Sequence, residues 1–424
     1  MSHDDFTRWL ETVAGVDRVD GRTDRALGVG RAVVRCTHEG RRAVAVRERH
    51  EQIPALMDLL HLHLTQAQLP GCGRPEVADE VTVLLVEDDE VSEAADALAT
   101  LAAEVRGDVR VRVLRVDSVG EVHPIGPAPD LADIVSLNYK RWPGLLCGIE
   151  QGPSDLVRAI VDATGRPELR AYPMLSHAGR RWSLRVEGLE VGRIEASGGT
   201  LGVGKEGKKG GTSRKRAAWV AVAGTDPVEV TTEAPGAAAD LIRSFAEKWR
   251  GWTSKSTGEP KQDEHALESR ILRGEVPLDT ADGTRLGLLK PDSTDPVNWG
   301  SQFPTRWGRR DGSSARYLDA LLRDGDVPWA VEIKVDGGSG TGRYYRHAVA
   351  QAVLYRAFIR QATPLAPWFQ QQGLDQRACR AAVVVPEAST SRADRPTDLA
   401  ELCRRFDVEL ITVPRETARL GRLD

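Results

Sequence analysis

Cysteine is scarce in this chain, and the few cysteines form no pattern. The five cysteines among the 424 residues are Cys36, Cys72, Cys147, Cys379 and Cys403. Their number is odd and no two of them have the CxxC spacing, which argues against a disulfide framework and against a zinc site. Scattered cysteines of this kind are typical of the reducing cytoplasm, and we expect a cytoplasmic protein.

Long apolar runs are missing as well. No segment approaches the roughly eighteen uncharged apolar residues that a membrane helix requires. The first residues, Met1 to Asp5, lack the basic stretch and the apolar core of a secretory signal. We therefore expect a soluble protein that is not exported and has no membrane partner.

Two function classes find little support in composition and motifs. The glycines of residues 198–211 do not form the GxxxxGK[ST] loop, so nucleotide hydrolysis is not indicated. The formal net charge of −4 argues against a protein that nucleic acid coats on all sides, but it is compatible with local basic patches.

The length predicts more than one domain, because 424 residues exceed one ordinary domain core. Turn-rich segments at 120–129 and 253–262 divide the chain into three parts. We predict a multidomain α/β fold: an N-terminal α/β domain for recognition or regulation over residues 1–125, a middle α+β region over 126–252, and a C-terminal α/β domain with a central mixed sheet over 262–424.

The strongest chemical signal lies in residues 317–355. Two apolar runs of strand length, 315–322 and 327–335, flank a turn at 323–326. In the second run Glu332 and Lys334 are two residues apart, so a strand points both side chains to one face and the neighbouring valines and isoleucine to the other. Asp319 is then expected to face Glu332 from the adjacent strand.

Two carboxylates held close together repel each other unless a cation lies between them, and hard oxygen ligands suit Mg²⁺ or Mn²⁺. Such a metal polarises a phosphodiester and lowers the pKa of a bound water. The Lys334 ammonium can orient that water or neutralise the charge that develops on phosphorus. The pattern therefore predicts metal-dependent phosphodiester hydrolysis.

The acid of one strand followed by acid-x-lysine on the next resembles the PD-(D/E)xK nuclease superfamily. Gln351 and Tyr355, on a helix expected over 343–361, are similar to the QxxxY motif of its RecB-like branch. The resemblance covers about residues 262–424 and implies a restriction-endonuclease-like fold of order α-β-β-β-α-β-α-β. It implies Asp319, Glu332, Lys334, Gln351 and Tyr355 as site residues.

A glutamate on the helix that precedes the strands is common in this superfamily. The helix expected over 263–272 carries Glu264 and Glu268 one turn apart. We favour Glu268, because it lies between Leu267 and Ile271 near the core side of the helix. The resemblance then implies Asp319, Glu332 and Glu268 as the metal ligands, with Glu264 as the alternative.

The N-terminal part has a similar order of strands and helices. We expect helices at 6–13, 52–69 and 91–105, and strands at 31–37, 42–47, 80–86 and 109–116. Aligned with the acid-x-lysine strand, Ala45 and Arg47 replace Glu332 and Lys334. One interpretation is a degenerate nuclease-like domain used for binding, dimerisation or sensing, and the other is a generic α/β domain.

The middle region should contain helices at 155–164 and 237–249 and strands at 169–175, 181–186, 190–196 and 217–223. A glycine-rich loop between the last two strands holds six basic residues that could contact nucleic-acid phosphates or could be solvated: Lys205, Lys208, Lys209, Arg214, Lys215 and Arg216. Three arginines of the 302–310 stretch could also contact phosphates beside a stacking Trp307, or the stretch could be an ordinary loop: Arg306, Arg309 and Arg310.

Together these patterns predict a magnesium- or manganese-dependent DNA endonuclease, with a role in bacterial defence against phage or foreign DNA. RNA is the alternative substrate, and a homodimer or defence partner proteins are possible assemblies. The alternatives for function are a repair or recombination nuclease, a nuclease controlled by a ligand or partner, and a non-catalytic nucleic-acid-binding protein. An acid-x-lysine pattern alone also occurs in ordinary half-exposed strands.

Overall fold

The computed structural model of the chain is a mixed α/β structure with several sheets. It describes residues 2–20, 33–47, 49–64, 77–86, 93–126, 152–174, 181–202, 214–248, 262–305, 316–335, 341–387 and 396–418. None of the helices in these ranges combines the length and the apolar character that crossing a bilayer requires.

The N-terminal module is built around a six-stranded sheet. Its strands, in spatial order, are β1 (Val16–Asp20), β2 (Val33–His38), β3 (Arg41–Val46), β4 (Val77–Val86), β5 (Arg110–Val116) and β6 (Val122–Pro124). β3, β4 and β5 are parallel neighbours, and the other neighbours are antiparallel. Its helices are α1 (His3–Leu10), α2 (Arg49–Leu64) and α3 (Glu93–Glu104). A Ser2–Asp5 capping box starts α1.

The middle module is a five-stranded antiparallel sheet with three helices. Its strands are β7 (Leu169–Met174), β8 (Arg181–Val186), β9 (Leu189–Glu195), β10 (Gly198–Leu201) and β11 (Val228–Thr231). Its helices are α6 (Asp155–Thr164), α7 (Arg214–Ala223) and α8 (Pro235–Lys248). Ser154 caps the start of α6 and Gly165, at φ 62°, ends it, as the chemistry of helix termini favours.

The C-terminal module contains a second five-stranded mixed sheet. In spatial order its strands are β14 (Ser301–Thr305), β15 (Arg316–Asp324), β16 (Val327–Ile333), β17 (Arg380–Pro386) and β18 (Glu409–Val413). Its helices are α10 (Gln262–Leu272), α11 (Thr341–Gln361), α12 (Ala366–Gln371), α13 (Pro396–Arg405) and α14 (Arg415–Ala418). Smaller elements complete it: the pair β12 (Leu278–Asp279) and β13 (Arg285–Leu286), and the 3-10 helices η3 (Thr363–Leu365) and η4 (Gln376–Ala378).

The two faces of the C-terminal sheet have different partners. Val331, Ile333 and Val335 lie on the face that packs against Leu267 and Ile271 of α10. The opposite face, with Ala330, packs against α11 in a different apolar cluster. This confirms the predicted alternation along β16, which places Glu332 and Lys334 on the other side from the valines.

The N-terminal and C-terminal sheets have the same topology over five strands. In each, strands one to three are antiparallel neighbours and strands three to five are parallel neighbours. A helix precedes the first strand (α1 or α10), a second connects strands three and four (α2 or α11), and a third connects strands four and five (α3 or α13).

The strand register corrects the alignment predicted for these two modules. The β2–β3 hairpin turns at Glu39-Gly40 and the β15–β16 hairpin at Gly325-Asp326. Counted from those turns, Val46, and not Ala45, is equivalent to Glu332. A shift of one residue moves a side chain to the opposite face, and Ala45 faces α1 with Ala43. Val33 is equivalent to Asp319, and Lys334 corresponds to Glu48, a position outside the described residues.

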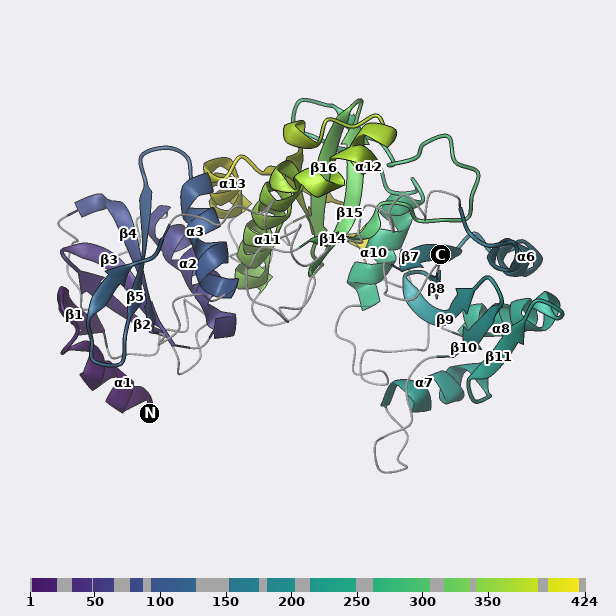
Figure 1. Cartoon of the computed structure of the whole chain (residues 1–424), viewed down its shortest axis with the longest axis horizontal. Helices are drawn as coiled ribbons and strands as arrows, with labels where there is room; N and C mark the ends of the chain where they lie inside the picture. The colour runs from purple at the N-terminus through teal and green to yellow at the C-terminus, as the bar shows by residue number, and fades with distance from the viewer. Residues whose placement is uncertain are drawn as a thin grey trace.

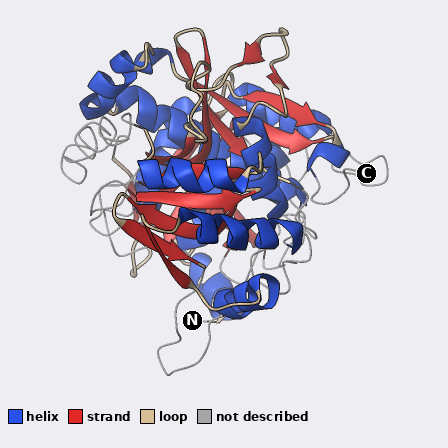
Figure 2. Cartoon of the chain, turned by 90° about the vertical axis from the view of Figure 1, so that its right-hand side faces the viewer, coloured by secondary structure: helices blue, strands red, loops and turns tan. Residues whose placement is uncertain are grey.

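The three modules are not arranged in chain order. Figure 1 shows the N-terminal sheet at the left, the C-terminal module in the centre and the middle module at the right. α2 and α3 pack against α11 and α13, and one apolar cluster includes buried residues of both modules. Figure 2 gives the view from the side of the middle module, with the strands in red and the helices in blue.

Two segments differ from the predicted structure. Residues 217–223 were expected as a strand because of their valines, but they belong to α7. Four of these seven residues are alanines, which have high helix propensity, and Trp219 stacks on Phe245 of α8 at 5.1 Å between ring centroids. The expected linker at 120–129 contains β6, which forms an antiparallel pair with β5. Short edge strands such as β1 and β6 have little sequence signal of their own.

Candidate metal-dependent active site

Three side chains predicted from the sequence meet at the ends of β15 and β16. Ala320 pairs with Val331 across these strands, so Asp319 and Glu332 follow at adjacent positions. The Lys334 ammonium forms an ion pair with Glu332 Oε1, lies 3.7 Å from Asp319 Oδ2 and donates a 2.9 Å hydrogen bond to the Ile333 carbonyl oxygen. The predicted juxtaposition is therefore confirmed.

The members of this acidic centre differ in their access to solvent. Glu332 and Lys334 are each 1% exposed. The Asp319 side chain is 20% exposed, and its Oδ2 accepts a 2.8 Å hydrogen bond from the backbone N–H of Ile333. Of these three side chains, Asp319 is therefore the most exposed to solvent, and the β16 backbone fixes its orientation.

The helix α10 adds two buried glutamates, and Glu264, the alternative of the two predicted ligands, is the one within ion-pair distance of Lys334. Glu264 Oε1 lies 3.4 Å from the Lys334 ammonium. Glu268 instead accepts a 2.5 Å hydrogen bond from Ser301 Oγ and lies 3.5 Å from His265 Nδ1. Both glutamates are buried one turn apart on the same face, so the position of α10 along its axis decides which one lies beside Lys334. Ser301, which holds Glu268 from β14, was not predicted.

The helix α11 places Gln351 and Tyr355 beside the centre. Gln351 Nε2 lies 3.4 Å from Tyr355 Oη, and Tyr355 Oη donates a 3.1 Å hydrogen bond to the carbonyl oxygen of Tyr317 in β15. Tyr317 is two residues before Asp319, so this bond ties α11 to the strand that carries Asp319. Their four-residue spacing places both side chains on one face of α11.

Burial and crowding of acids shift the pKa values in this centre. Burial, opposed by Lys334 and reinforced by Glu264 and Glu268, raises the pKa of Asp319 to about 6. Burial and the neighbouring Asp319 raise the pKa of Glu332 to about 8, against the opposing effect of Lys334. Burial, with Glu332 and Asp319 nearby, also raises the pKa of Tyr355 well above its ordinary value, so its hydroxyl remains a donor.

The donor set suits a hard divalent cation. Glu332 Oε2 is buried and, among the described residues, has no hydrogen-bond partner. A buried carboxylate oxygen without a donor is costly unless a proton or a cation compensates it. Asp319, Glu332 and Glu264 offer the oxygen ligands that Mg²⁺ and Mn²⁺ prefer, and the Lys334 ammonium provides positive charge among them.

Another group of possible ligand residues lies elsewhere. Asp117, Glu121 and His123 bring their ligand atoms within 4.8 Å of one another, and no other such group of three is found in the described ranges. The Asp117 carboxylate accepts hydrogen bonds from the N–H groups of Val119 and Glu121 and from His123. These hydrogen bonds belong to the turn between β5 and β6, and they explain why the three side chains lie close together. The ligand atoms of Asp319, Glu332 and Glu264 do not all lie within 4.8 Å of one another.

The basic residues predicted to contact phosphates are only partly placed. Arg216 lies in α7 and pairs with Asp226 at 3.0 Å, so it belongs to a helix and not to a loop. Arg214 and Lys215 form the first turn of the same helix. The other predicted contacts lie outside the described residues: Lys205, Lys208, Lys209, Arg306, Arg309 and Arg310. The start of the 302–310 stretch is β14, with Phe303 packed against Trp368 and Phe369.

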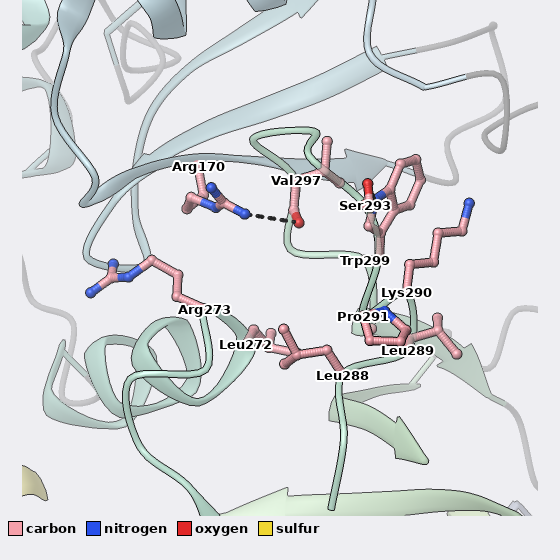
Figure 3. Close-up of a pocket in the computed structure, with 11 residues that line it drawn as sticks. Arg170, Leu272, Arg273, Leu288, Leu289, Lys290, Pro291, Ser293, Val297 and Trp299 are labelled. Atoms are coloured by element: carbon pink, nitrogen blue, oxygen red, sulfur yellow. Dashed lines mark hydrogen bonds between the residues drawn. The ribbon is translucent and has the colours of Figure 1, made fainter. Parts of the chain in front are cut away.

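A separate pocket of about 250 Å³ lies between the middle and C-terminal modules (Figure 3). Its wall contains apolar residues, such as Leu272 and Trp299, and three basic residues, Arg170, Arg273 and Lys290. Arg170 donates to the Val297 carbonyl oxygen at 3.4 Å, as Figure 3 shows. No residue of the acidic centre lines this pocket, although Leu272 ends the helix that carries Glu264.

Comparison of the chain with protein-family models, with curated proteins and with solved structures gave no match.

Proposed function

We propose that this protein is a divalent-metal-dependent nuclease that hydrolyses phosphodiester bonds of DNA. The observation that carries the proposal is the Lys334 ammonium held among Asp319, Glu332 and Glu264 at the ends of two adjacent strands. Burying three acids and one lysine together costs free energy, because each unpaired charge loses its hydration. Such a cost is common at functional sites, where perturbed pKa values cluster.

We further propose that residues 262–424 have the restriction-endonuclease-like fold. The order α10, β14, β15, β16, α11, β17, α13 and β18 follows the expected α-β-β-β-α-β-α-β, apart from the inserted β12–β13 pair and α12. Asp319 and the acid-x-lysine of Glu332 and Lys334 occupy neighbouring strands of that sheet, and α11 brings Gln351 and Tyr355 beside them. Each of these features supports the resemblance to the PD-(D/E)xK superfamily.

In the proposed reaction a water oxygen forms a new bond to phosphorus, one bridging P–O bond breaks, and the departing sugar oxygen takes up a proton. Asp319, Glu332 and Glu264 would hold the metal. A bound Mg²⁺ or Mn²⁺ would polarise the phosphate and lower the pKa of a water molecule. Lys334 orients the attacking water and stabilises negative charge on the phosphate oxygens, and Tyr355 fixes the strand that carries Asp319.

Defence against phage or foreign DNA is the biological role that we propose for this activity, with repair or recombination as the alternative. Both rest on the chemistry of the C-terminal module alone. The remaining 260 residues would then serve recognition or regulation.

The test is a substrate panel. Supercoiled plasmid, linear duplex, single-stranded DNA and RNA are incubated with the protein in Mg²⁺, Mn²⁺ or EDTA. We expect metal-dependent cutting of DNA. The substitutions Glu332→Ala and Lys334→Ala should abolish it. Circular substrates distinguish an endonuclease from an exonuclease. If the well-folded protein cuts none of these substrates, the proposal is contradicted.

The pocket between the modules favours a second candidate, a nuclease that an anionic ligand controls. Its basic side chains include Arg170. Burial, together with the neighbouring Arg273, lowers the pKa of Arg170. An anion bound there would lie at the end of α10 and beside Gly300, which precedes Ser301. The test is thermal unfolding of wild type and Arg170→Ala with a panel of mononucleotides. A shift in wild type alone, together with faster cutting, would support this candidate, and no shift would exclude it.

A further inference from the structure

The N-terminal module repeats the topology of the C-terminal module but lacks its acids. Counting from the two hairpin turns places Val33 and Val46 at the positions of Asp319 and Glu332, and these valines pair with each other across β2 and β3. Both are buried in an apolar cluster, where the C-terminal module has its acidic centre. Lys334 corresponds to Glu48, a residue of opposite charge. Of the described residues, Val33 and Val46, which stand where Asp319 and Glu332 stand, therefore offer no ligand for a metal.

The two modules contact each other through equivalent helices. α2 packs on its equivalent α11, while α3 packs on α11 and α2 packs on α13. In a two-fold, isologous interface, element i of one half contacts element j of the other half, and element j of the first half contacts element i of the second. The pattern of helix contacts is thus that of a homodimer, formed here within one chain.

Ion pairs at the edge of this interface repeat the same reciprocity. Asp108 and Asp407 each stand two residues before the first residue of their strand, β5 or β18, and Arg106 and Arg405 each stand two residues before that aspartate. Arg106 pairs with Asp407 at 3.0 Å, and Arg405 pairs with Asp108 at 2.5 Å. The backbone N–H of Arg106 also donates to the Arg405 carbonyl oxygen at 2.7 Å.

We propose that the chain is a fused pseudo-dimer with one working centre, and that it nicks one strand of a duplex in each encounter. This inference rests on the proposed nuclease function. The strands of a duplex are antiparallel, so cutting both in one encounter needs two centres related by a two-fold axis. Here the module that would supply the second centre has valines instead of carboxylates.

The same interface leaves no room for a second catalytic copy on that face. The inner helices of the C-terminal module, α11 and α13, are covered by α2 and α3 of the same chain, and buried apolar residues join them. A second chain could not use this face to add its own centre without displacing the N-terminal module. We therefore infer that the active species contains one centre per bound duplex.

The test follows supercoiled plasmid through time with the full chain in Mg²⁺ or Mn²⁺. We expect nicked circles to accumulate until the supercoiled form is consumed, with linear DNA appearing only later, as independent nicks meet. Glu332→Gln should lose all cutting, since no second centre exists, while the exposed Glu416→Gln serves as the matched control and keeps wild-type products. Light scattering should give the mass of one chain, 46.3 kDa, for the free protein.

The outcomes distinguish this inference from the function on which it rests. Linear product formed from the start at the rate of nicked circles, metal-dependent cutting by Glu332→Gln at about half the wild-type rate, or twice the chain mass would overturn the single-centre inference while leaving a nuclease. An absence of cutting by folded wild type would overturn both.

Discussion

Tyr355 Oη donates a 3.1 Å hydrogen bond to the carbonyl oxygen of Tyr317, which joins α11 to β15 two residues before Asp319. We expect Tyr355→Phe to lower the free energy of unfolding by about 1–2 kcal/mol, since it removes the hydroxyl's hydrogen bonds with Tyr317 and Gln351 without changing the shape of the ring. Cutting should slow while metal dependence persists, because the strand that carries Asp319 loses one support. Urea unfolding and cleavage rates would check this, and an unchanged rate would exclude a positioning role.

Lys334 balances the buried acids, so its removal should destabilise the protein when no metal is present. Truncating one partner of a buried charged cluster typically costs about 3–5 kcal/mol. We expect Lys334→Ala to show a loss of this order in EDTA and to recover part of it in Mn²⁺, because the cation replaces the missing charge. Glu416→Gln, at an exposed position, should unfold like wild type. Equal stability of Lys334→Ala and wild type in EDTA would contradict the described electrostatics.

The stability of the metal-free protein should fall as pH rises from about 4 to about 8. The folded-state pKa values of Asp319 and Glu332, about 6 and about 8, lie above their ordinary values of 3.8 and 4.5. The folded protein therefore holds protons that the unfolded chain releases, and the associated stability is lost as pH rises. In Glu332→Gln the decline near pH 8 should disappear. Urea titrations in EDTA across this range measure it, and a flat profile for wild type would contradict the shifts.

A buried arginine contributes to the interface between the N-terminal and C-terminal modules. Arg356 is fully buried and donates to Glu104 Oε2 at 2.7 Å and to the carbonyl oxygens of Phe406 and Asp407. We expect Arg356→Ala to lower stability by about 3–5 kcal/mol, because three acceptors lose their donor. Arg404→Ala removes an exposed pair with Glu401 and should change stability by less than about 1 kcal/mol. Similar values for the two variants would argue against a tightly packed interface.

Three of the five cysteines should resist modification in the native protein. Cys36, Cys379 and Cys403 are buried, and burial raises the pKa of the last two to about 12. Thiolate is the reactive form, so thiol reagents at pH 8 should leave these three unlabelled until the protein is unfolded. Mass spectrometry of the labelled peptides provides the measurement. Rapid labelling of Cys379 in folded protein would mean that the core opens easily.

Much of the acidic centre could be predicted because it depends on local periodicity. The two-residue spacing of Glu332 and Lys334 in a strand and the four-residue spacing of Gln351 and Tyr355 in a helix determine which side chains share a face. The choice between Glu264 and Glu268 could not be predicted, since both lie on one face of α10. The position of α10 along its axis, which decides between them, depends on how Leu267 and Ile271 pack on the sheet.

The errors elsewhere have similar causes. Residues 217–223 have the valines of a strand but pack as a helix, because Trp219 fits against α8. The comparison of the two modules was wrong by one residue, since sequence resemblance alone does not define the strand register that the hairpin turns fix. The pairing of Arg356 with Glu104, 252 residues away, has no sequence signal at all.

The most direct test of the acidic centre compares initial rates of DNA cleavage by wild type, Glu332→Gln and Glu416→Gln at saturating Mg²⁺ and equal folded fraction. The predicted result is cleavage by wild type and Glu416→Gln that EDTA abolishes, and a loss of at least about 10²-fold in Glu332→Gln, the order expected for removing one key electrostatic group. Wild-type rates in Glu332→Gln, with its fold intact, would contradict the assignment of this centre.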